Sequence, residues 1–260
     1  MTEIGADSPS TVIELPNGST ITLAWAAVTD VGRKRRANED SYIARVPIFA
    51  VADGMGGHLS GDLASDAVVR RLDEGLPKIT AAPQLIEQAL ERASADIDLI
   101  AGESEIGVGT TVTGAVLTIL DGVAQLAVFN IGDSRVYRFQ RNSLKQVTTD
   151  HSLVQQLFDS GKISRSQTVK HPEGNIITRA VGFRSQPTPD FWMVPVTAGL
   201  RLLMCSDGLT GELDDKRLRL HFAAGLSTRE TASSLVDAAL AAGGRDNVTV
   251  IVLDVLAVTP

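Results

Sequence analysis

Four aspartates in this chain of 260 residues adjoin apolar runs, where their carboxylates could meet a cation. Asp53 ends IFAVAD, Asp133 follows LAVFNIG and Asp207 follows RLLMCS, whereas Asp246 precedes the run NVTVIV. Glycines beside these positions let a carboxylate point into a cleft without crowding. Carboxylates gathered together repel one another unless a cation neutralises them, and oxygen ligands suit Mg²⁺ or Mn²⁺. The pattern therefore indicates a divalent metal site.

A simpler interpretation applies to each position taken alone. An Asp-Gly pair at the end of a strand is more often a turn than a metal ligand. Four such positions, joined by the acidic cluster NED at residues 38–40, make coincidence a weaker explanation. On the residues alone, both the turns and the metal site stay open.

Composition narrows the class of protein. With 31 acidic and 24 basic residues, the formal net charge is −7, which argues against nucleic-acid binding and does not indicate binding to an anionic membrane. The lone cysteine, Cys205, allows no internal disulfide and fits a reducing compartment. MTEIGADSPS lacks the apolar core of a signal peptide, and no run reaches the ~18 apolar residues of a membrane span. We expect a cytoplasmic protein.

The elements that position these acids are predicted from periodicity. Strands are expected in TVIELPNGSTITLAW with a hairpin at Asn17-Gly18, in SYIARV and PIFAVAD, on either side of a hairpin at Asp121-Gly122, in RLLMCSDG and in NVTVIVLDV. Helices are expected from Gly61, after Pro83 and from Ser227, where Glu230 three residues later completes a capping box. Two apolar stripes support the first two helices: Leu63, Ala64, Ala67, Val68, Leu72 and Leu76, then Ile86, Ala89, Leu90, Ala93, Ile97 and Ile100.

Strands in consecutive groups, with helices between the groups, predict an α+β protein. The natural layered solution is a four-layer α-β-β-α sandwich, in which two antiparallel sheets are flanked by pairs of helices. We expect a loose polar end at residues 1–10 and a single domain at residues 11–257. Residues 150–190 are polar and weakly periodic, which indicates a mobile insertion over the body of the domain.

The motifs RRANED, VADGMGG, GTT, NIGDSR, CSDG and GGRDNVTV occur in this order, from about residue 24 to residue 254. Their ordered set resembles the PPM-type, metal-dependent Ser/Thr protein phosphatases, also called the type 2C family. The DGMGG form and the chain length are similar to the bacterial branch. This resemblance implies the same sandwich, with a binuclear metal centre at one end.

The resemblance also implies the metal ligands. Asp53 would bridge two Mn²⁺ or Mg²⁺ ions, and the Gly54 carbonyl with Glu39 would complete the protein ligands of one ion. Asp207 and Asp246 would hold the other ion.

Further roles carried over by motif concern a third ion, water and phosphate. Asp133 with Asp207 would bind a third, weaker metal ion. Asp40 would orient metal-bound water, and Arg35 would bind the substrate phosphate, with Arg36 as the alternative within RKRR.

The chemistry implied is direct hydrolysis of phosphoserine and phosphothreonine. Two divalent ions lower the pKa of a shared water, and the resulting hydroxide attacks phosphorus without a covalent phosphoenzyme. The expected partners are phosphorylated proteins, namely Ser/Thr kinases and their substrates. The protein itself is expected to be a monomeric signalling enzyme. Lys162, Arg165 and Lys170 of the insertion could attract phosphoproteins, although solvated charge explains each of them equally simply.

One position departs from the family pattern. Eukaryotic relatives commonly carry a histidine two residues after the bridging aspartate, proposed as general acid, and Met55 stands there in this sequence. His58 lies nearby but reads more simply as a loop residue, so the general acid is left unassigned.

The sequence also argues against two other phosphatase chemistries. A cysteine-based phosphatase needs an arginine six residues after its cysteine, and Cys205 is followed there by Gly211. An aspartyl-phosphate hydrolase needs an aspartate two residues before Asp53, where Val51 stands. The remaining alternatives are a catalytically silent phosphoprotein-binding pseudophosphatase, which would be expected to lack metal carboxylates, and a phosphatase for small phosphoesters.

Overall fold

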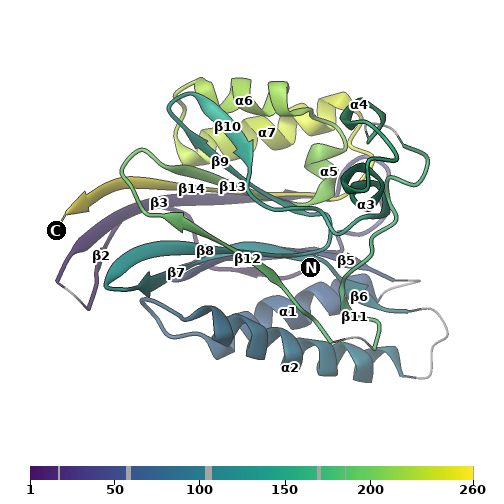
Figure 1. Cartoon of the computed structure of the whole chain (residues 1–260), viewed down its shortest axis with the longest axis horizontal. Coiled ribbons are helices and arrows are strands. Elements are labelled where there is room, and N and C mark those ends of the chain that lie inside the picture. Colours follow the sequence, from purple (N-terminus) through teal and green to yellow (C-terminus); the bar gives the residue numbers. More distant parts are fainter. Residues whose placement is uncertain (17, 57–59, 103–106, 169–170, 185, 260) are drawn as a thin grey trace.

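The computed structural model describes residues 1–16, 18–56, 60–102, 107–168, 171–184 and 186–259. Two sheets lie face to face, and helices cover the outer face of each (Figure 1). This arrangement confirms the predicted α-β-β-α sandwich.

The first sheet has the order β1-β4-β5-β7-β8-β12, with β6 and β11 attached beside β5. Its strands are β1 (Glu3–Ile4), β4 (Asp40–Arg45), β5 (Ile48–Met55), β6 (Gly109–Thr110), β7 (Val112–Leu120), β8 (Val123–Ile131), β11 (Val181–Gly182) and β12 (Asp190–Pro195). Helices α1 (Gly61–Gly75) and α2 (Pro83–Ala101) cover its outer face (Figure 1).

The second sheet has the order β10-β9-β13-β14-β3-β2. Its strands are β2 (Ser8–Glu14), β3 (Thr20–Asp30), β9 (Arg135–Gln140), β10 (Ser143–Gln146), β13 (Arg201–Cys205) and β14 (Val248–Thr259). Helices α6 (Asp215–Ala223) and α7 (Thr228–Ala242) cover its outer face (Figure 1). The short helix α5 (Asp207–Thr210) follows β13 directly, at the end of the sandwich where α3 (Leu153–Asp159) and α4 (Arg165–Thr168) also lie.

The apolar core has three layers because successive strand residues point to opposite faces of a sheet. In β5, Phe49 and Val51 face the second sheet, where Phe49 packs against Trp25 with ring centroids 5.3 Å apart. Ile48 and Ala50 alternate with them and face α1 and α2. A third cluster lies between the second sheet and the helices α6 and α7.

Most local predictions agree with the structure. Ser227 and Glu230 form the capping box of α7, and Gly243 caps its C-terminal end. Asp121 and Gly122 both have positive φ, at 50° and 77°, as a two-residue hairpin turn requires. The predicted turn at Asn17-Gly18 joins β2 to β3, although Asn17 itself lies outside the described residues.

Three details differ from the sequence prediction. Residues 1–10 are not a loose end, because β1 pairs with β4 and β2 begins at Ser8. The β1–β4 pair is parallel, whereas every other strand pair that the structure describes is antiparallel. Leu63 and Ile100, predicted on the buried stripes of their helices, are 46% and 40% exposed, and both stand in terminal turns.

Residues 150–190, predicted as an insertion, contain α3, α4 and β11. Strand β11 pairs with β6, so this part of the chain returns to the first sheet before β12 begins. Its mobility stays a prediction. In the described ranges, no helix has the length and apolarity needed to cross a membrane.

Candidate active site

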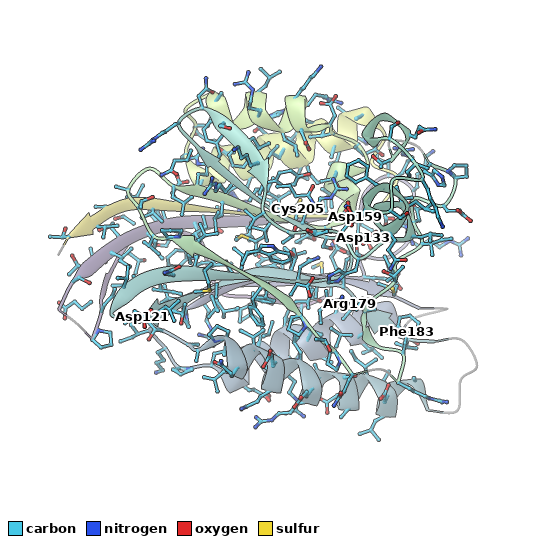
Figure 2. All side chains as sticks on the ribbon, in the orientation of Figure 1. Asp121, Asp133, Asp159, Arg179, Phe183 and Cys205 are labelled. Carbon is cyan, nitrogen blue, oxygen red and sulfur yellow. The ribbon has the colours of Figure 1, made fainter. Side chains whose placement is uncertain are left out.

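The predicted site residues gather at the end of the sandwich where β5 ends and α5 begins. Asp40 and Asp53 are cross-strand partners in the β4–β5 pair. Asp133 lies in the turn between β8 and β9, and Asp207 is the first residue of α5. Asp246 stands in the loop between α7 and β14. Figure 2 shows Asp133 at the end of the sandwich beside α3 and α5.

Asp53 is held through its backbone by two neighbouring threonines. Its carbonyl oxygen accepts hydrogen bonds from the Thr110 hydroxyl at 2.8 Å and from the Thr111 N–H at 2.9 Å. Burial raises the pKa of the Asp53 carboxyl well above its usual range, and repulsion from Asp40 and Asp207 raises it further. The strand thus delivers a carboxylate to a place where its negative charge is costly without a cation.

Burial and nearby negative charge also raise the pKa values of Asp133 and Asp207. Burial, followed by repulsion from Asp207, raises the pKa of Asp133 to about 8. Burial and repulsion from Asp246 raise the pKa of Asp207, which also lies within hydrogen-bonding reach of Asp53. The three carboxylates therefore form one electrostatically coupled group.

Asp40 is fully buried, and its two oxygens have different surroundings. Its Oδ2 accepts hydrogen bonds from the hydroxyls of Ser206 at 2.8 Å and Thr249 at 2.6 Å. Its Oδ1 is buried with no hydrogen-bond partner within the described part of the chain. Burial raises the pKa of Asp40 to about 7, although the two hydroxyl donors act to lower it. Hydrogen bonds therefore fix one oxygen of this carboxyl, Oδ2, whereas the other, Oδ1, can accept a proton.

Gly54 and Glu39 lie where β5 meets the start of α1. The Gly54 N–H donates to the Glu39 carbonyl at 3.2 Å. A Cβ on Gly54 would lie 2.0 Å from the Gly61 carbonyl oxygen, so no larger residue fits this crossing. The glycine after Asp53 therefore has a packing reason of its own, besides its predicted role as a carbonyl ligand. Burial raises the pKa of Glu39, and the charge of Arg35 acts to lower it.

Arg35 reaches the site from the loop between β3 and β4. Its Nη2 lies 2.5 Å from Asp246 Oδ2, and this hydrogen bond is the main cause of the raised pKa of Arg35. The positive charge of the Arg35 guanidinium thus lies beside Asp246, a predicted metal ligand. Arg36 is exposed.

The chemistry of this donor set suits a divalent cation. The side chains are oxygen donors, three of the carboxyls are destabilised by burial and mutual repulsion, and Asp40 Oδ1 has no hydrogen-bond partner in the described ranges. No three histidine, cysteine, aspartate or glutamate side chains among the described residues lie close enough to hold one metal ion. The ligand assignments accordingly stay predictions.

Sequence reasoning missed the residues that hold these acids in place. Asn247, next to Asp246, donates from its side-chain amide to the carbonyls of Val31 and Ala37 at 2.8 and 2.9 Å. Its Oδ1 accepts the Glu39 N–H at 2.9 Å. One buried side chain thereby shapes the loop that carries Arg35 and Glu39. The signal was present in the sequence, since Asn247, Ser206 and Thr249 belong to the same motifs as the carboxylates.

We expect Asn247→Ala to lower the free energy of unfolding by roughly 2–4 kcal/mol, because three backbone groups lose their hydrogen bonds to a buried side chain. Chemical denaturation of the metal-free protein measures this change. Asn175→Ala is the matched control, since Asn175 is exposed, and it should change stability by less than about 0.5 kcal/mol. Equal stabilities of the two variants would contradict the role assigned to Asn247.

Other predicted positions add little to the site. Met55 is the last residue of β5 and has no proton to donate, as the sequence indicated. His58 and Lys170 lie outside the described residues, as does the side chain of Arg165. Cys205 is fully buried in β13, as expected for a strand residue without a catalytic role.

Known proteins are similar to this chain in sequence and in structure. The family model for protein phosphatase 2C matches residues 34–242. The chain is 36% identical to the serine/threonine phosphatase stp of Listeria welshimeri over 239 residues, which cover 87% of this chain and 93% of that protein. The crystal structure of the Mycobacterium tuberculosis serine/threonine phosphatase PstP/Ppp matches with a TM-score of 0.81 at 32% identity, covering 91% of this chain and all of that one.

A second crystal structure bears on the metal. It is the catalytic domain of the serine/threonine phosphatase PstP in complex with two manganese ions. It matches with a TM-score of 0.77 at 33% identity, covering 91% of this chain and 99% of that one.

Proposed function

The chain belongs to the protein phosphatase 2C family and is a protein serine/threonine phosphatase, and we propose that it hydrolyses phosphoserine and phosphothreonine with two Mn²⁺ or Mg²⁺ ions. The observation that carries the proposal is the coupled group of Asp53, Asp133 and Asp207 beside Arg35. Such a group binds a positive centre and, through it, an anionic substrate.

Five residues would hold the two ions in this proposal. Asp53 would be shared between the ions, Glu39 and the Gly54 carbonyl would complete the first, and Asp207 with Asp246 would complete the second. When bound, divalent cations supply the Lewis acidity that makes hydroxide available near neutral pH. Asp133 with Asp207 offers oxygens for a third, weaker ion.

Asp40 would orient the attacking water. Ser206 and Thr249 fix its Oδ2, whereas Oδ1, which has no hydrogen-bond partner among the residues that the structure describes, can accept a proton from water. A carboxyl with a pKa of about 7 in the metal-free protein can hold a proton near neutral pH.

Arg35 would bind the phosphoryl group. Among contacts within the described residues, its guanidinium uses Nη2 to hold Asp246. A guanidinium has five N–H donors, so further donors remain for two phosphoryl oxygens. The positive charge would stabilise these oxygens as charge shifts onto them during hydrolysis.

Protonation of the leaving group is not assigned to a side chain. Met55 cannot donate a proton, and the imidazole of His151 is engaged on both sides by Gly132 and Asp190. Solvent water at the site is the proposed donor.

A pseudophosphatase is the rival function, and no observation favours it, because every predicted metal carboxylate is present in the sequence. We propose phosphorylated Ser/Thr kinases and their substrates as partners, and the family assignment supports phosphoproteins as the substrate class. A cytoplasmic location is proposed from the single, buried, unpaired Cys205. The monomeric state stays a prediction.

The proposal is tested by phosphate release from a phosphothreonine peptide with Mn²⁺ and after chelation of the metal. We expect turnover with Mn²⁺ and its loss with chelator. Binding of the phosphopeptide without phosphate release in Mn²⁺ would sink the enzymatic proposal and support a pseudophosphatase. A parallel assay with p-nitrophenyl phosphate distinguishes a small-molecule phosphatase, which would prefer that substrate to the peptide.

A further inference from the structure

His151 holds the backbone on the N-terminal side of Asp133. This histidine is 7% exposed. Its N–H donates to the Gly132 carbonyl at 2.8 Å, and its Nδ1 accepts the Gly132 N–H at 3.1 Å. His151 therefore contacts both backbone polar groups of Gly132, which immediately precedes Asp133. The Asn130 side-chain amide also donates to the Gly132 carbonyl, at 2.9 Å.

The other face of the imidazole is turned toward β12. His151 Nε2 lies 3.2 Å from Asp190 Oδ2. Since Nδ1 accepts a hydrogen bond, Nε2 carries the proton and donates it to Asp190, as a neutral imidazole can. Burial lowers the pKa of His151 and so favours this neutral form. Asp190 Oδ1 in turn accepts from Arg179 Nη1 at 2.8 Å.

The 152–180 segment begins immediately after His151 and ends where β11 starts. Hydrogen bonds bring its two ends together beside this histidine. The Thr178 N–H donates to the His151 carbonyl at 2.7 Å, and the Leu153 N–H donates to the Ile176 carbonyl at 2.8 Å. Figure 2 shows Arg179, at the C-terminal end of this segment, at the same end of the sandwich as Asp133. Both ends of the 152–180 segment are therefore tied to His151 or its hydrogen-bond partners.

The neighbouring residue holds the chain on the other side of Asp133. Asp150 is buried, and both its oxygens accept from the guanidinium of Arg135: Oδ2 from Nη2 at 2.6 Å and from Nε at 2.9 Å, and Oδ1 from Nε at 3.0 Å. The consecutive pair Asp150–His151 thus holds Gly132, immediately before Asp133, and Arg135, two residues after it. Thr111 packs closely against Gly132, since a Cβ on Gly132 would lie 2.5 Å from the Thr111 side chain.

We propose that His151 is a positioning residue that joins the 152–180 segment to the loop of Asp133, so that displacing the segment also displaces Asp133. Asp190 and Arg179 transmit the displacement to the imidazole, and Gly132 transmits it to Asp133. The consequence for catalysis rests on the proposed function: a phosphoprotein that contacts the segment would then alter the predicted third metal site.

Amide hydrogen exchange of the metal-free protein tests the connection without substrate. Asp190→Ala removes the partner of His151 Nε2 and leaves the imidazole and Gly132 in place. We expect the Gly132 and Thr178 amides to exchange about tenfold faster in this variant, as follows from the loss of one charge-assisted hydrogen bond. Unchanged exchange at Gly132 would overturn the proposal, because among the described residues the Asp190 carboxylate reaches Gly132 only through His151. The substitution leaves in place the backbone pairing of Asp190 with Asn130, whose amide also bonds to Gly132.

Two further variants sharpen the experiment. His151→Asn keeps an acceptor near Gly132 but cannot reach Asp190, so the double variant with Asp190→Ala should exchange no faster at Thr178 than either single variant. Additive effects would contradict a shared contact. His221→Ala is the matched control, because this histidine bonds to Ser234 between α6 and α7, and Gly132 exchange should stay at the wild-type rate. If Asp190→Ala fails to fold, Asp190→Val is measured instead, because valine suits a strand and has no acceptor for His151 Nε2, and wild-type exchange in it likewise overturns the proposal.

Kinetics separate positioning from a loss of folded structure. With a phosphothreonine peptide, Asp190→Ala should need about tenfold more Mn²⁺ for half-maximal activity and recover kcat to within about twofold at saturating Mn²⁺. A kcat that Mn²⁺ fails to restore would indicate a structural role and overturn positioning. An inactive wild-type protein would instead sink the proposed function, while the exchange result would still decide whether the segment and the Asp133 loop are joined.

Discussion

Asp207→Asn is expected to lower phosphothreonine hydrolysis at saturating Mn²⁺ by at least about 100-fold, because the proposed second ion loses a carboxylate ligand. The same substitution is expected to raise the melting temperature of the metal-free protein. Burial and repulsion from Asp246 raise the pKa of Asp207, so its ionised carboxylate destabilises the fold. Asparagine removes this charge and can donate a hydrogen bond to Asp53.

These two effects give a crossover that calorimetry can follow. Without metal, the variant should melt a few degrees above the wild type, since about 1 kcal/mol corresponds to roughly 2–4 °C in a protein of this size. With Mn²⁺, the wild type should gain stability by binding the ion and melt above the variant. A loss of activity caused by misfolding would lower both melting temperatures.

Asp237→Asn is the control for Asp207→Asn, because it makes the same chemical change on an exposed carboxylate of α7. It should leave turnover and the Mn²⁺-induced stabilisation at wild-type values. If Asp207→Asn retained metal-dependent turnover, the predicted ligand set would be wrong, even though the family assignment would stand.

Arg35→Ala is expected to lower kcat/KM for a phosphothreonine peptide by about 100-fold, as the loss of one preorganised donor group to a phosphoryl oxygen does. The same substitution should not weaken the binding of Mn²⁺. Arg35 holds Asp246 at 2.5 Å in the metal-free protein, so its removal frees a predicted ligand and makes the site more negative. Mn²⁺ should bind the variant at least as tightly as the wild type.

Arg36→Ala provides the comparison for Arg35→Ala, since Arg36 is the exposed neighbour that the sequence left as the alternative phosphate ligand. Its kcat/KM should stay within about twofold of the wild-type value, as expected for a surface change. The measurements are steady-state kinetics and a calorimetric Mn²⁺ titration. A larger loss in Arg36→Ala than in Arg35→Ala would transfer the phosphate-binding role to Arg36.

Much of the fold followed from local pattern. The capping box at Ser227 and the positive-φ turn at Asp121-Gly122 depend on a few adjacent residues, so the sequence predicted them correctly. Local pattern does not reveal that residues 1–10 are ordered, because their order comes from partners far along the chain. The Thr2 N–H donates to the Ser41 hydroxyl, and β1 pairs with β4.

The sequence by itself determined which side chains could do the chemistry, because acids at the ends of apolar strands and their motif order are local features. Only the tertiary structure decided how those acids are held. Asn247 shapes the loop of Glu39, Ser206 and Thr249 fix one oxygen of Asp40, and Arg35 meets Asp246 across 211 positions of sequence. These contacts form where strands of both sheets end close together. The spacing of their residues in the sequence does not predict this proximity.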